Sequence, residues 1–305
     1  MPELKPRRMK RLCTLLTCVV LSVWSGMALQ AQEPIELPLW PEGPTESNGL
    51  SGPETIVGSR HYTANVSVPT LTFYPARADR NTGISIILAP GGGYAALALP
   101  QEGEPVARWL AEQGISGLVL KYRMPNGHRR IPLDDAQQAM RLIRAHASEW
   151  GLDTARIGIM GFSAGGHLAS TLLTHYEADT RPAFGILCYP VISFADSLVH
   201  RGSMLQLLGA DTTATCKDYY SNERHITPNT PPTMLLLSNN DGTVKTRNST
   251  LFYDRLKQNG VPAALYLFPT GGHGWGFQTS FVYHERLKTL VLDWIRFLYP
   301  ETTLP

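Results

Sequence analysis

Cysteine is scarce in this chain of 305 residues, which contains four. Cys13 and Cys18 fall in an apolar N-terminal stretch, so only Cys188 and Cys216 remain in the rest of the chain. Two cysteines are too few for the disulfide framework that stabilises many small secreted domains. The apolar run 184–192 around Cys188 is typical of a buried thiol. We expect Cys188 and Cys216 to be free thiols, although a disulfide between them would be compatible with an oxidising compartment.

Several motifs that bind metals or phosphates are also absent. The chain has no H-E-x-x-H sequence and no paired cysteines at the spacing of zinc ligands, so the sequence predicts no metal site. It has no G-x-G-x-x-G pattern, and its run of three glycines is not followed by the lysine of a P-loop. Internal repeats, blocks of like charge and low-complexity segments are missing as well. We therefore expect chemistry that needs no metal and no cofactor.

No strong charge imbalance exists either, because the chain has 27 basic and 25 acidic residues. Five of the basic residues lie among the first 31 residues, together with one acidic residue. The remaining chain therefore has 22 basic and 24 acidic residues, a net charge of −2. Such a balance does not produce the basic surface of a nucleic-acid-binding protein. We expect no nucleic-acid partner.

The first 31 residues have the three parts of a secretory signal peptide. A basic region at residues 5–11 precedes an apolar run at 12–24, and small residues follow around Ala28 and Ala31. The apolar run is shorter than the roughly 20 residues that span a bilayer. We therefore expect residues 1–31 to be cleaved, which predicts a periplasmic or secreted protein without stable membrane insertion.

Strand-like and helix-like segments alternate along the rest of the chain. Most strand candidates are continuous apolar runs, as in a parallel sheet that is covered on both faces. The predicted strands are 70–74, 84–89, 117–122, 157–161, 184–189, 233–238 and 263–268. The predicted helices are 102–113, 132–150, 164–176, 247–259 and 283–298. This alternation predicts an α/β fold with a mostly parallel, doubly wound sheet in one domain over residues 32–305.

Two segments do not follow the alternation. Residues 33–53 are rich in proline, glycine and glutamate, so we expect them to lie extended over the surface. Residues 193–232 show no strand pattern and contain one short helix-like stretch, 204–208. This segment leaves the sheet at the carboxyl end of a strand, where open α/β sheets bind ligands. It is predicted to be a small cap over the active site, and a passive surface insertion is the alternative.

Residues 157–169 carry the strongest functional signal in the chain. An apolar, strand-like stretch runs into Gly161-Phe162-Ser163-Ala164-Gly165, and helix-forming residues follow. This is the G-x-S-x-G pattern of a nucleophile elbow, a turn so tight that side chains at the flanking glycines would collide with neighbouring backbone. We predict that Ser163 is a catalytic nucleophile, and a plain glycine-rich connection is the alternative.

A serine hydroxyl needs a base within hydrogen-bond distance and a carboxylate that orients the base. His273 follows the last predicted strand in a glycine-rich loop, and we predict that it is the base. Asp241 follows the preceding strand and is the predicted acid, with Asp196 as the alternative. The order Ser163, Asp241, His273 is that of α/β-hydrolases. His167 lies on the helix after the elbow and is predicted to serve in packing or as a polar residue at the start of that helix.

Acyl transfer also needs hydrogen-bond donors for the developing oxyanion. One predicted donor is the amide of Ala164, next to the nucleophile. The others are the amides of Gly92 and Gly93, in the sequence PGGGY that follows an earlier strand. Tyr94 and Trp275 flank this predicted site and are predicted to contact the substrate, although aromatic residues in such loops more often pack against their neighbours.

The loops that carry these residues resemble the signature loops of a known family. Secreted bacterial α/β-hydrolases of the acetyl esterase and acetyl-xylan esterase type, which are distantly similar to the catalytic domain of prolyl oligopeptidases, have similar sequences at 90–94, 161–169 and 271–276. The resemblance covers nearly all of the chain after the signal peptide. It implies an α/β-hydrolase fold, the triad Ser163, Asp241 and His273, and no cofactor.

By this resemblance the protein is a serine carboxylesterase that removes acetyl groups from carbohydrates such as acetylated xylan, through an acyl-serine intermediate. The chain departs from the family at residues 238–241, SNND in place of H-x-x-D-D, and at Lys245, where proline is usual. These departures concern substrate choice more than chemistry. A feruloyl esterase is the main alternative, followed by a serine peptidase and a non-catalytic binding protein. The expected partner is a small ester or an oligosaccharide ester. The sequence does not indicate whether the protein is a monomer or an oligomer.

Overall fold

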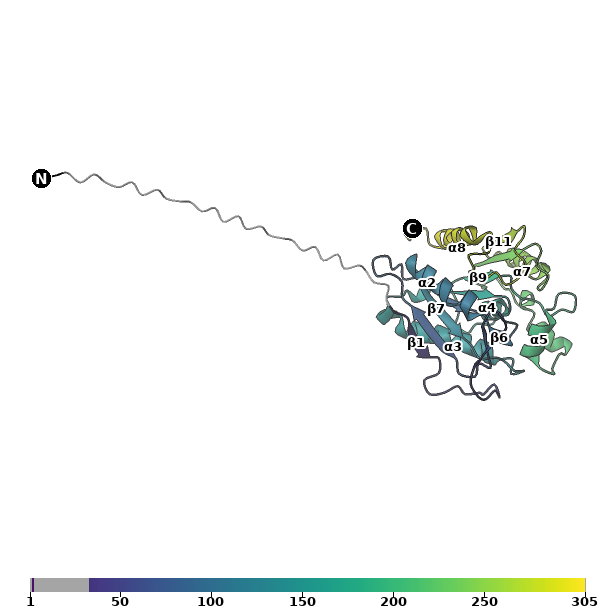
Figure 1. Ribbon diagram of the computed structural model, residues 1–305. Coiled ribbons are helices and arrows are strands. Elements are labelled where there is room, and N and C mark those ends of the chain that lie inside the picture. Colours follow the sequence, from purple (N-terminus) through teal and green to yellow (C-terminus); the bar gives the residue numbers. More distant parts are fainter. Residues whose placement is uncertain (1, 3–32, 305) are drawn as a thin grey trace. The chain divides into compact units, whose positions relative to one another are not determined.

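An eight-stranded sheet forms the centre of the computed structural model, which describes residue 2 and residues 33–304 (Figure 1). All but one residue of the predicted signal peptide therefore lie outside the described residues. The strand order is β1-β4-β7-β5-β8-β9-β10-β11, and the strands from β7 to β11 run parallel. The bounds are β1 Ile35–Pro38, β4 Thr70–Tyr74, β7 Ser116–Lys121, β5 Ser85–Ala89, β8 Ile157–Phe162, β9 Gly185–Cys188, β10 Thr233–Ser238 and β11 Ala263–Phe268.

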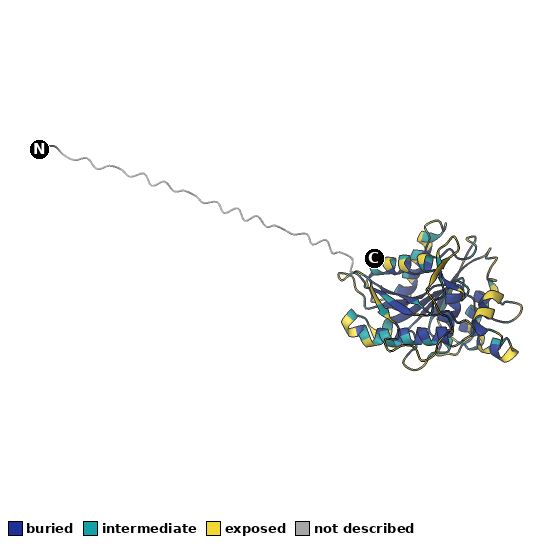
Figure 2. Ribbon diagram, turned by 60° about the horizontal axis from the view of Figure 1, so that its bottom comes forward, coloured by how far each residue is buried: buried dark blue, intermediate teal, exposed yellow. Residues whose placement is uncertain are grey.

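Helices cover both faces of this sheet, so the inner strands are buried along their whole length (Figure 2). One apolar cluster packs a sheet face against the helices α3 (Ile131–Trp150), α4 (Ala164–Thr174) and α7 (Arg247–Gln258). A second cluster packs the other face against α2 (Glu104–Glu112) and α8 (His284–Leu298). Two-sided burial explains why the inner strands are continuous apolar runs without alternation.

The α/β class and the mostly parallel sheet predicted from the sequence are confirmed. β4, β10 and β11 have the predicted bounds, β5 and β8 differ by one residue at one end, and β7 and β9 differ by one residue at both ends. The predicted helix 102–113 corresponds mainly to α2. Its first residue, Glu102, instead ends a separate short helix, α1 (Leu99–Glu102), and the two helices meet at Gly103. Gly103 has no helical backbone angles (φ −107°, ψ −100°), and a side chain there would approach the carbonyl oxygen of Leu99 to 2.9 Å.

The N-terminal segment does more than lie over the surface. Its residues 35–38 form β1, which pairs antiparallel with β4 and extends the central sheet by one strand. The residues of β1 are mostly exposed, so no apolar pattern marks it in the sequence. A small antiparallel sheet of β2 (Thr55–Val57), β3 (Tyr62–Ala64) and β6 (Ala96–Leu97) was also missed, because two or three residues are too few for a recognisable period.

Residues 193–232 contain two helices, α5 (Arg201–Leu208) and α6 (Ala214–Tyr219), and a 3-10 helix, η2 (Asn222–Arg224). The predicted helical stretch 204–208 lies within α5, which starts earlier because the side chain of His200 caps it by accepting from the amide of Ser203. Apolar side chains of this segment belong to the same cluster as α3 and α4. Its role as a cap remains a prediction.

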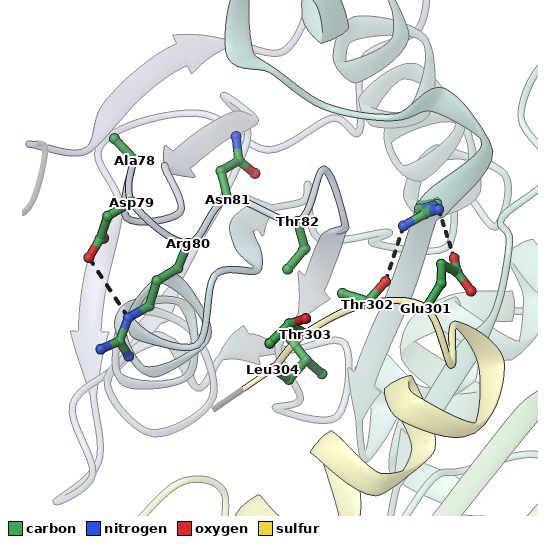
Figure 3. Close-up of a pocket in the computed structure, with 10 residues that line it drawn as sticks. Ala78, Asp79, Arg80, Asn81, Thr82, Glu301, Thr302, Thr303 and Leu304 are labelled. Atoms are coloured by element: carbon green, nitrogen blue, oxygen red, sulfur yellow. Dashed lines mark hydrogen bonds and ion pairs between the residues drawn. The ribbon is translucent and has the colours of Figure 1, made fainter.

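Cys188 and Cys216 are both buried and free, as expected from the sequence. None of the described helices combines the length and the hydropathy that crossing a membrane requires. A cavity of about 630 Å³ lies between residues 78–82 and residues 301–304 (Figure 3). Residues 78–82 precede β5, and Glu301 and Thr302 hydrogen-bond to Arg156, which directly precedes β8. The cavity therefore lies at the amino ends of these strands, opposite the edge described next.

Candidate active site

Three polar side chains meet at the carboxyl edge of the parallel strands. Ser163 follows β8, Asp241 follows β10 and His273 follows β11, so the parallel order brings all three to the same edge. The Ser163 Oγ lies 2.8 Å from His273 Nε2, and His273 Nδ1 lies 2.7 Å from Asp241 Oδ2. The result is a continuous row of hydrogen bonds from a hydroxyl through an imidazole to a carboxylate.

The turn that carries Ser163 has no room for side chains at its flanking glycines. A Cβ at Gly161 would lie 2.3 Å from the carbonyl oxygen of Gly165, and a Cβ at Gly165 would lie 2.0 Å from that of Ala89. Ser163 itself has a positive φ of 52°, which non-glycine residues rarely adopt. Close packing of α4 against β8 therefore explains Gly161, and close packing of α4 against the end of β5 explains Gly165.

The loop after β10 orients the Asp241 carboxylate toward His273. Its Oδ1 accepts hydrogen bonds from the amides of Thr243 and Val244, both at 2.9 Å, which leaves Oδ2 for the imidazole. Burial alone would raise the pKa of Asp241, but the hydrogen bond and the charge of His273, with the two amides, lower it below its ordinary value. An ionised acceptor at Asp241 assigns the proton to Nδ1 of His273, so Nε2 accepts the hydrogen bond from the Ser163 hydroxyl.

Asp196, the alternative acid, lies elsewhere. Its side chain is 86% exposed, and its Oδ1 lies 2.6 Å from Lys217 Nζ. The structure thus brings Asp241, and not Asp196, to His273.

The glycine-rich loop after β5 is held by hydrogen bonds to its backbone. The carbonyl oxygen of Pro90 accepts from the Tyr122 hydroxyl at 2.7 Å, and that of Gly91 accepts from the amide of Ala98 at 2.9 Å. A Cβ at Gly91 would lie only 2.9 Å from the Cβ of Ser163, so this loop lies directly against the serine.

The predicted oxyanion donors are Gly92, Gly93 and Ala164. In the described chain none of these three amides donates a hydrogen bond to another group of the protein. Gly92 and Gly93 both have positive φ, and a Cβ at Gly92 would lie 2.0 Å from the carbonyl oxygen of Ala96, so Gly92 must lack a side chain. Ala164 is the first residue of α4, where amides have no partner within the helix.

The buried position of Tyr94 argues against the predicted contact between this residue and the substrate. Its side chain is buried at 1% exposure, because the ring packs between Tyr122 and His167 and the hydroxyl hydrogen-bonds to His167 Nδ1 at 3.0 Å. Trp275 is also mostly buried, and its indole N–H donates to Ser238 Oγ at 3.1 Å. Trp275 still borders a cavity of about 270 Å³ beside His273, so its contact with substrate remains a prediction.

Sequence reasoning missed two buried residues beneath this edge, Glu102 and Tyr189. Their side chains hydrogen-bond to each other at 2.7 Å, and the Tyr189 ring contacts His273. Glu102 is the first residue of a predicted helix and Tyr189 is the last residue of a predicted strand, so neither position carries a local signal of function. No group of three or more His, Cys, Asp or Glu side chains within the described residues is arranged to hold a metal ion.

Comparisons with known proteins agree with this fold. The model of a family described as "alpha/beta hydrolase fold" matches residues 86–277. The solved structure of an acetyl ester-xyloside bifunctional hydrolase from Caldicellulosiruptor lactoaceticus is similar, with a TM-score of 0.72 and 36% identity. The similarity covers 86% of this chain and 95% of that one.

Two curated proteins are also similar in sequence. An acetylxylan esterase from Xylanibacter ruminicola is 36% identical over 222 residues, which cover 72% of this chain and 46% of that protein. An endo-1,4-beta-xylanase B from Butyrivibrio fibrisolvens is 34% identical over 222 residues, which cover 68% of this chain and 34% of that protein. The match therefore spans less than half of the length of either relative.

Proposed function

This chain belongs to the alpha/beta hydrolase family, and we propose that it is a serine carboxylesterase that removes acetyl groups from carbohydrates such as acetylated xylan or its oligomers. The observation that carries the chemistry is the hydrogen-bonded row of Ser163, His273 and Asp241 at the carboxyl edge of the sheet. The substrate class is supported by the relatives named acetylxylan esterase and acetyl ester-xyloside hydrolase.

In the first half of the proposed reaction, Ser163 Oγ attacks the ester carbonyl carbon while His273 Nε2 takes the hydroxyl proton. The carbonyl electron pair moves to oxygen, where the amides of Gly92, Gly93 and Ala164 stabilise the negative charge. Asp241 stabilises the imidazolium that forms. The tetrahedral intermediate then collapses, the bond to the sugar oxygen breaks, and His273 returns its proton to the departing alcohol.

In the second half, water hydrolyses the acetyl-serine. His273 takes a proton from the water as its oxygen attacks the acyl carbon, and the same three amides stabilise the second oxyanion. Collapse releases acetate, and His273 returns the proton to Ser163 Oγ. The free enzyme is regenerated without any group beyond the side chains and backbone of this chain.

The proposal extends to location and to access. Residues 1–31 serve as a cleaved signal peptide, so the protein acts in the periplasm or outside the cell. Residues 193–232 cap the carboxyl edge of the sheet, which is supported by the position of α5 between β9 and β10 in the chain order.

Replacement of Ser163 by alanine tests the proposed chemistry. We expect Ser163→Ala to lose about 10⁶-fold in kcat, by analogy with other serine hydrolases, and to keep its melting temperature. A fluorophosphonate probe followed by mass spectrometry should label Ser163 in the unmodified protein and should not label the Ser163→Ala variant. Ser197→Ala is the matched control, because Ser197 is exposed, and it should react and turn over normally.

The substrate is tested by rates on acetylated xylo-oligosaccharides, on the feruloyl ester of the same sugar and on p-nitrophenyl esters of increasing chain length. A preference for the acetylated sugar supports the proposal. Faster cleavage of the feruloyl ester would make the protein a feruloyl esterase instead. Undiminished hydrolysis by Ser163→Ala would overturn the mechanism itself.

A further inference from the structure

A buried carboxylate lies beneath the two loops that carry the proposed donors and the proposed base. Glu102 ends α1 and is 2% exposed. Its Oε2 accepts a hydrogen bond from the amide of Gly91 at 2.6 Å, and its Oε1 accepts one from the Tyr189 hydroxyl at 2.7 Å. One oxygen of this side chain therefore binds the glycine-rich loop and the other binds Tyr189.

Tyr189 continues the connection to the histidine loop. Its hydroxyl oxygen accepts a hydrogen bond from the amide of Gly276 at 2.9 Å. Its ring packs edge-on against His273, with 4.8 Å between the ring centroids. The Tyr189 backbone has a positive φ of 37° and donates its amide to the carbonyl oxygen of Leu236 at 2.7 Å, which holds the ring in this position.

The end of α1 also contacts the histidine loop directly. The carbonyl oxygen of Gln101 accepts a hydrogen bond from the amide of Phe277 at 2.8 Å. A Cβ at Gly276 would lie 2.7 Å from this oxygen and 3.1 Å from Cγ of Glu102. Only glycine fits so close to α1, which shows how tightly the loop is fitted to Glu102.

The surroundings of Glu102 offset the burial of its charge in part. Burial raises the pKa of its carboxyl above the ordinary value, while the amide of Gly91, the Tyr189 hydroxyl and the nearby His273 and Arg60 reduce this rise. The other titratable groups that face it are Tyr122 and Cys188, whose pKa values burial raises, so both stay neutral. Both carboxylate oxygens accept from N–H or O–H donors, as an ionised side chain requires.

We propose that Glu102 is a positioning residue for the reaction, because one carboxylate fixes the glycine-rich loop through Gly91 and the histidine loop through Tyr189. Glu102 thereby couples the position of the oxyanion donors to the position of the base. This inference rests on the proposed function. Both loops also have other anchors, because the Tyr122 hydroxyl binds Pro90 and the Arg60 guanidinium binds the carbonyl oxygen of Gly274. Loss of Glu102 should therefore shift the two loops relative to each other without unfolding them, which distinguishes a positioning role from a purely structural one.

Glu102→Gln and Tyr189→Phe test the connection from its two ends. A glutamine at 102 retains an oxygen for Gly91, but its amide group cannot accept the Tyr189 proton. A phenylalanine at 189 removes the acceptor of Gly276. We expect each variant to lose about 10- to 100-fold in kcat on p-nitrophenyl acetate, with KM within about twofold, because misplaced groups are felt mainly in the transition state.

The double variant Glu102→Gln/Tyr189→Phe distinguishes one shared connection from two separate effects. If both residues act in the same connection, the double variant should lose about as much kcat as the worse single variant. If Glu102→Gln does not fold, Tyr189→Phe alone decides, because it removes only a hydroxyl.

Glu223→Gln is the matched control. Glu223 is a buried carboxylate on η2 whose Oε1 accepts from Ser193 Oγ at 2.8 Å, and its pKa is likewise raised by burial. We expect Glu223→Gln to change the melting temperature as much as Glu102→Gln does, with unchanged kcat. The inference is overturned if Glu102→Gln and Tyr189→Phe keep kcat within twofold. It is also overturned if these variants and Glu223→Gln all lose kcat in proportion to their loss of stability, or if the losses of the two single variants multiply in the double variant. An enzyme that depends on Ser163 but not on Glu102 leaves the proposed function intact, whereas absence of Ser163-dependent hydrolysis refutes both.

Discussion

Ser163 has a backbone conformation that its neighbours hold in place. Its φ of 52° and ψ of −117° are unfavourable for a residue with a side chain, and strain of this kind costs about 1–3 kcal/mol. The Ser163 amide donates to the carbonyl oxygen of Cys188 at 3.0 Å, and its own carbonyl oxygen accepts from His167 and Val191 at 3.1 and 3.0 Å. With the backbone pinned by three hydrogen bonds, the hydroxyl stays directed at His273.

The choice of acid can be tested with two substitutions of the same kind. We expect Asp241→Asn to lower kcat by about 10⁴-fold, because an amide at 241 no longer favours the His273 tautomer that carries its proton on Nδ1. Asp196→Asn should leave kcat and the melting temperature nearly unchanged, because an exposed ion pair contributes little. Initial rates of both purified variants decide the matter. A large loss in Asp196→Asn with a small loss in Asp241→Asn would contradict the assignment.

At the scale of the elements, His167 joins helix α4 to the segment 193–232. Its Nε2–H donates to the carbonyl oxygen of Tyr220 at 2.9 Å, its Nδ1 accepts from Tyr94, and its ring stacks on Phe194 at 4.5 Å. These contacts agree with the packing role predicted from the sequence. They also require a neutral imidazole, and burial lowers the pKa of His167 to about 4.

This packed histidine should make stability depend on pH. Below pH 6.5 the unfolded chain gains a proton at residue 167 that the folded protein does not take up until about pH 4, so the free energy of unfolding falls as the pH drops through this interval. The variant His167→Gln has no group at residue 167 that takes up this proton. Between pH 6.5 and pH 4 we therefore expect its free energy of unfolding to fall by roughly 3 kcal/mol less than that of the unmodified protein.

Urea unfolding of both proteins at several pH values measures this difference. His175, whose pKa is also lowered to about 4 by burial, is present in both proteins, so the comparison isolates residue 167. Parallel pH curves for the two proteins would show that His167 does not titrate in this way.

At the scale of the whole molecule, a buried ion pair binds residues 33–53 to the rest of the domain. Asp135 on α3 is fully buried and lies 2.6 Å from the guanidinium of Arg123, just after β7. The same carboxylate accepts from the indole N–H of Trp40 at 2.8 Å, and Arg123 also donates to the carbonyl oxygen of Glu46. Segments far apart in the sequence are thus held by one pair of charges.

Loss of one partner should leave the other charge buried without compensation. We expect Asp135→Asn to lower the free energy of unfolding by about 3–5 kcal/mol and to speed proteolysis within residues 33–53. Asp134→Asn is the matched control, because the neighbouring Asp134 forms a partly exposed pair with Arg130 that should contribute at most about 1 kcal/mol. Equal destabilisation by the two substitutions, measured in urea, would contradict this role.

The sequence alone determined much of the framework because the signals involved are local. Continuous apolar runs report strands buried on two faces, and the glycines around Ser163 report a tight turn. Since parallel strands end at one edge, residues after β8, β10 and β11 could be nominated for a common site without any coordinates. The roles of Ser163, Asp241 and His273 remain predictions that the variants above would test.

The tertiary structure alone decided which polar side chains meet. Asp196 and Asp241 both follow strands, yet only the fold shows that one faces His273 and the other pairs with Lys217. Tyr94 appeared suited to substrate until the structure showed it buried against His167. Glu102 and Tyr189 are 87 residues apart, and neither carries a local pattern. Periodicity and turn chemistry report how each segment is buried, whereas hydrogen bonds between distant segments exist only after the whole chain has packed.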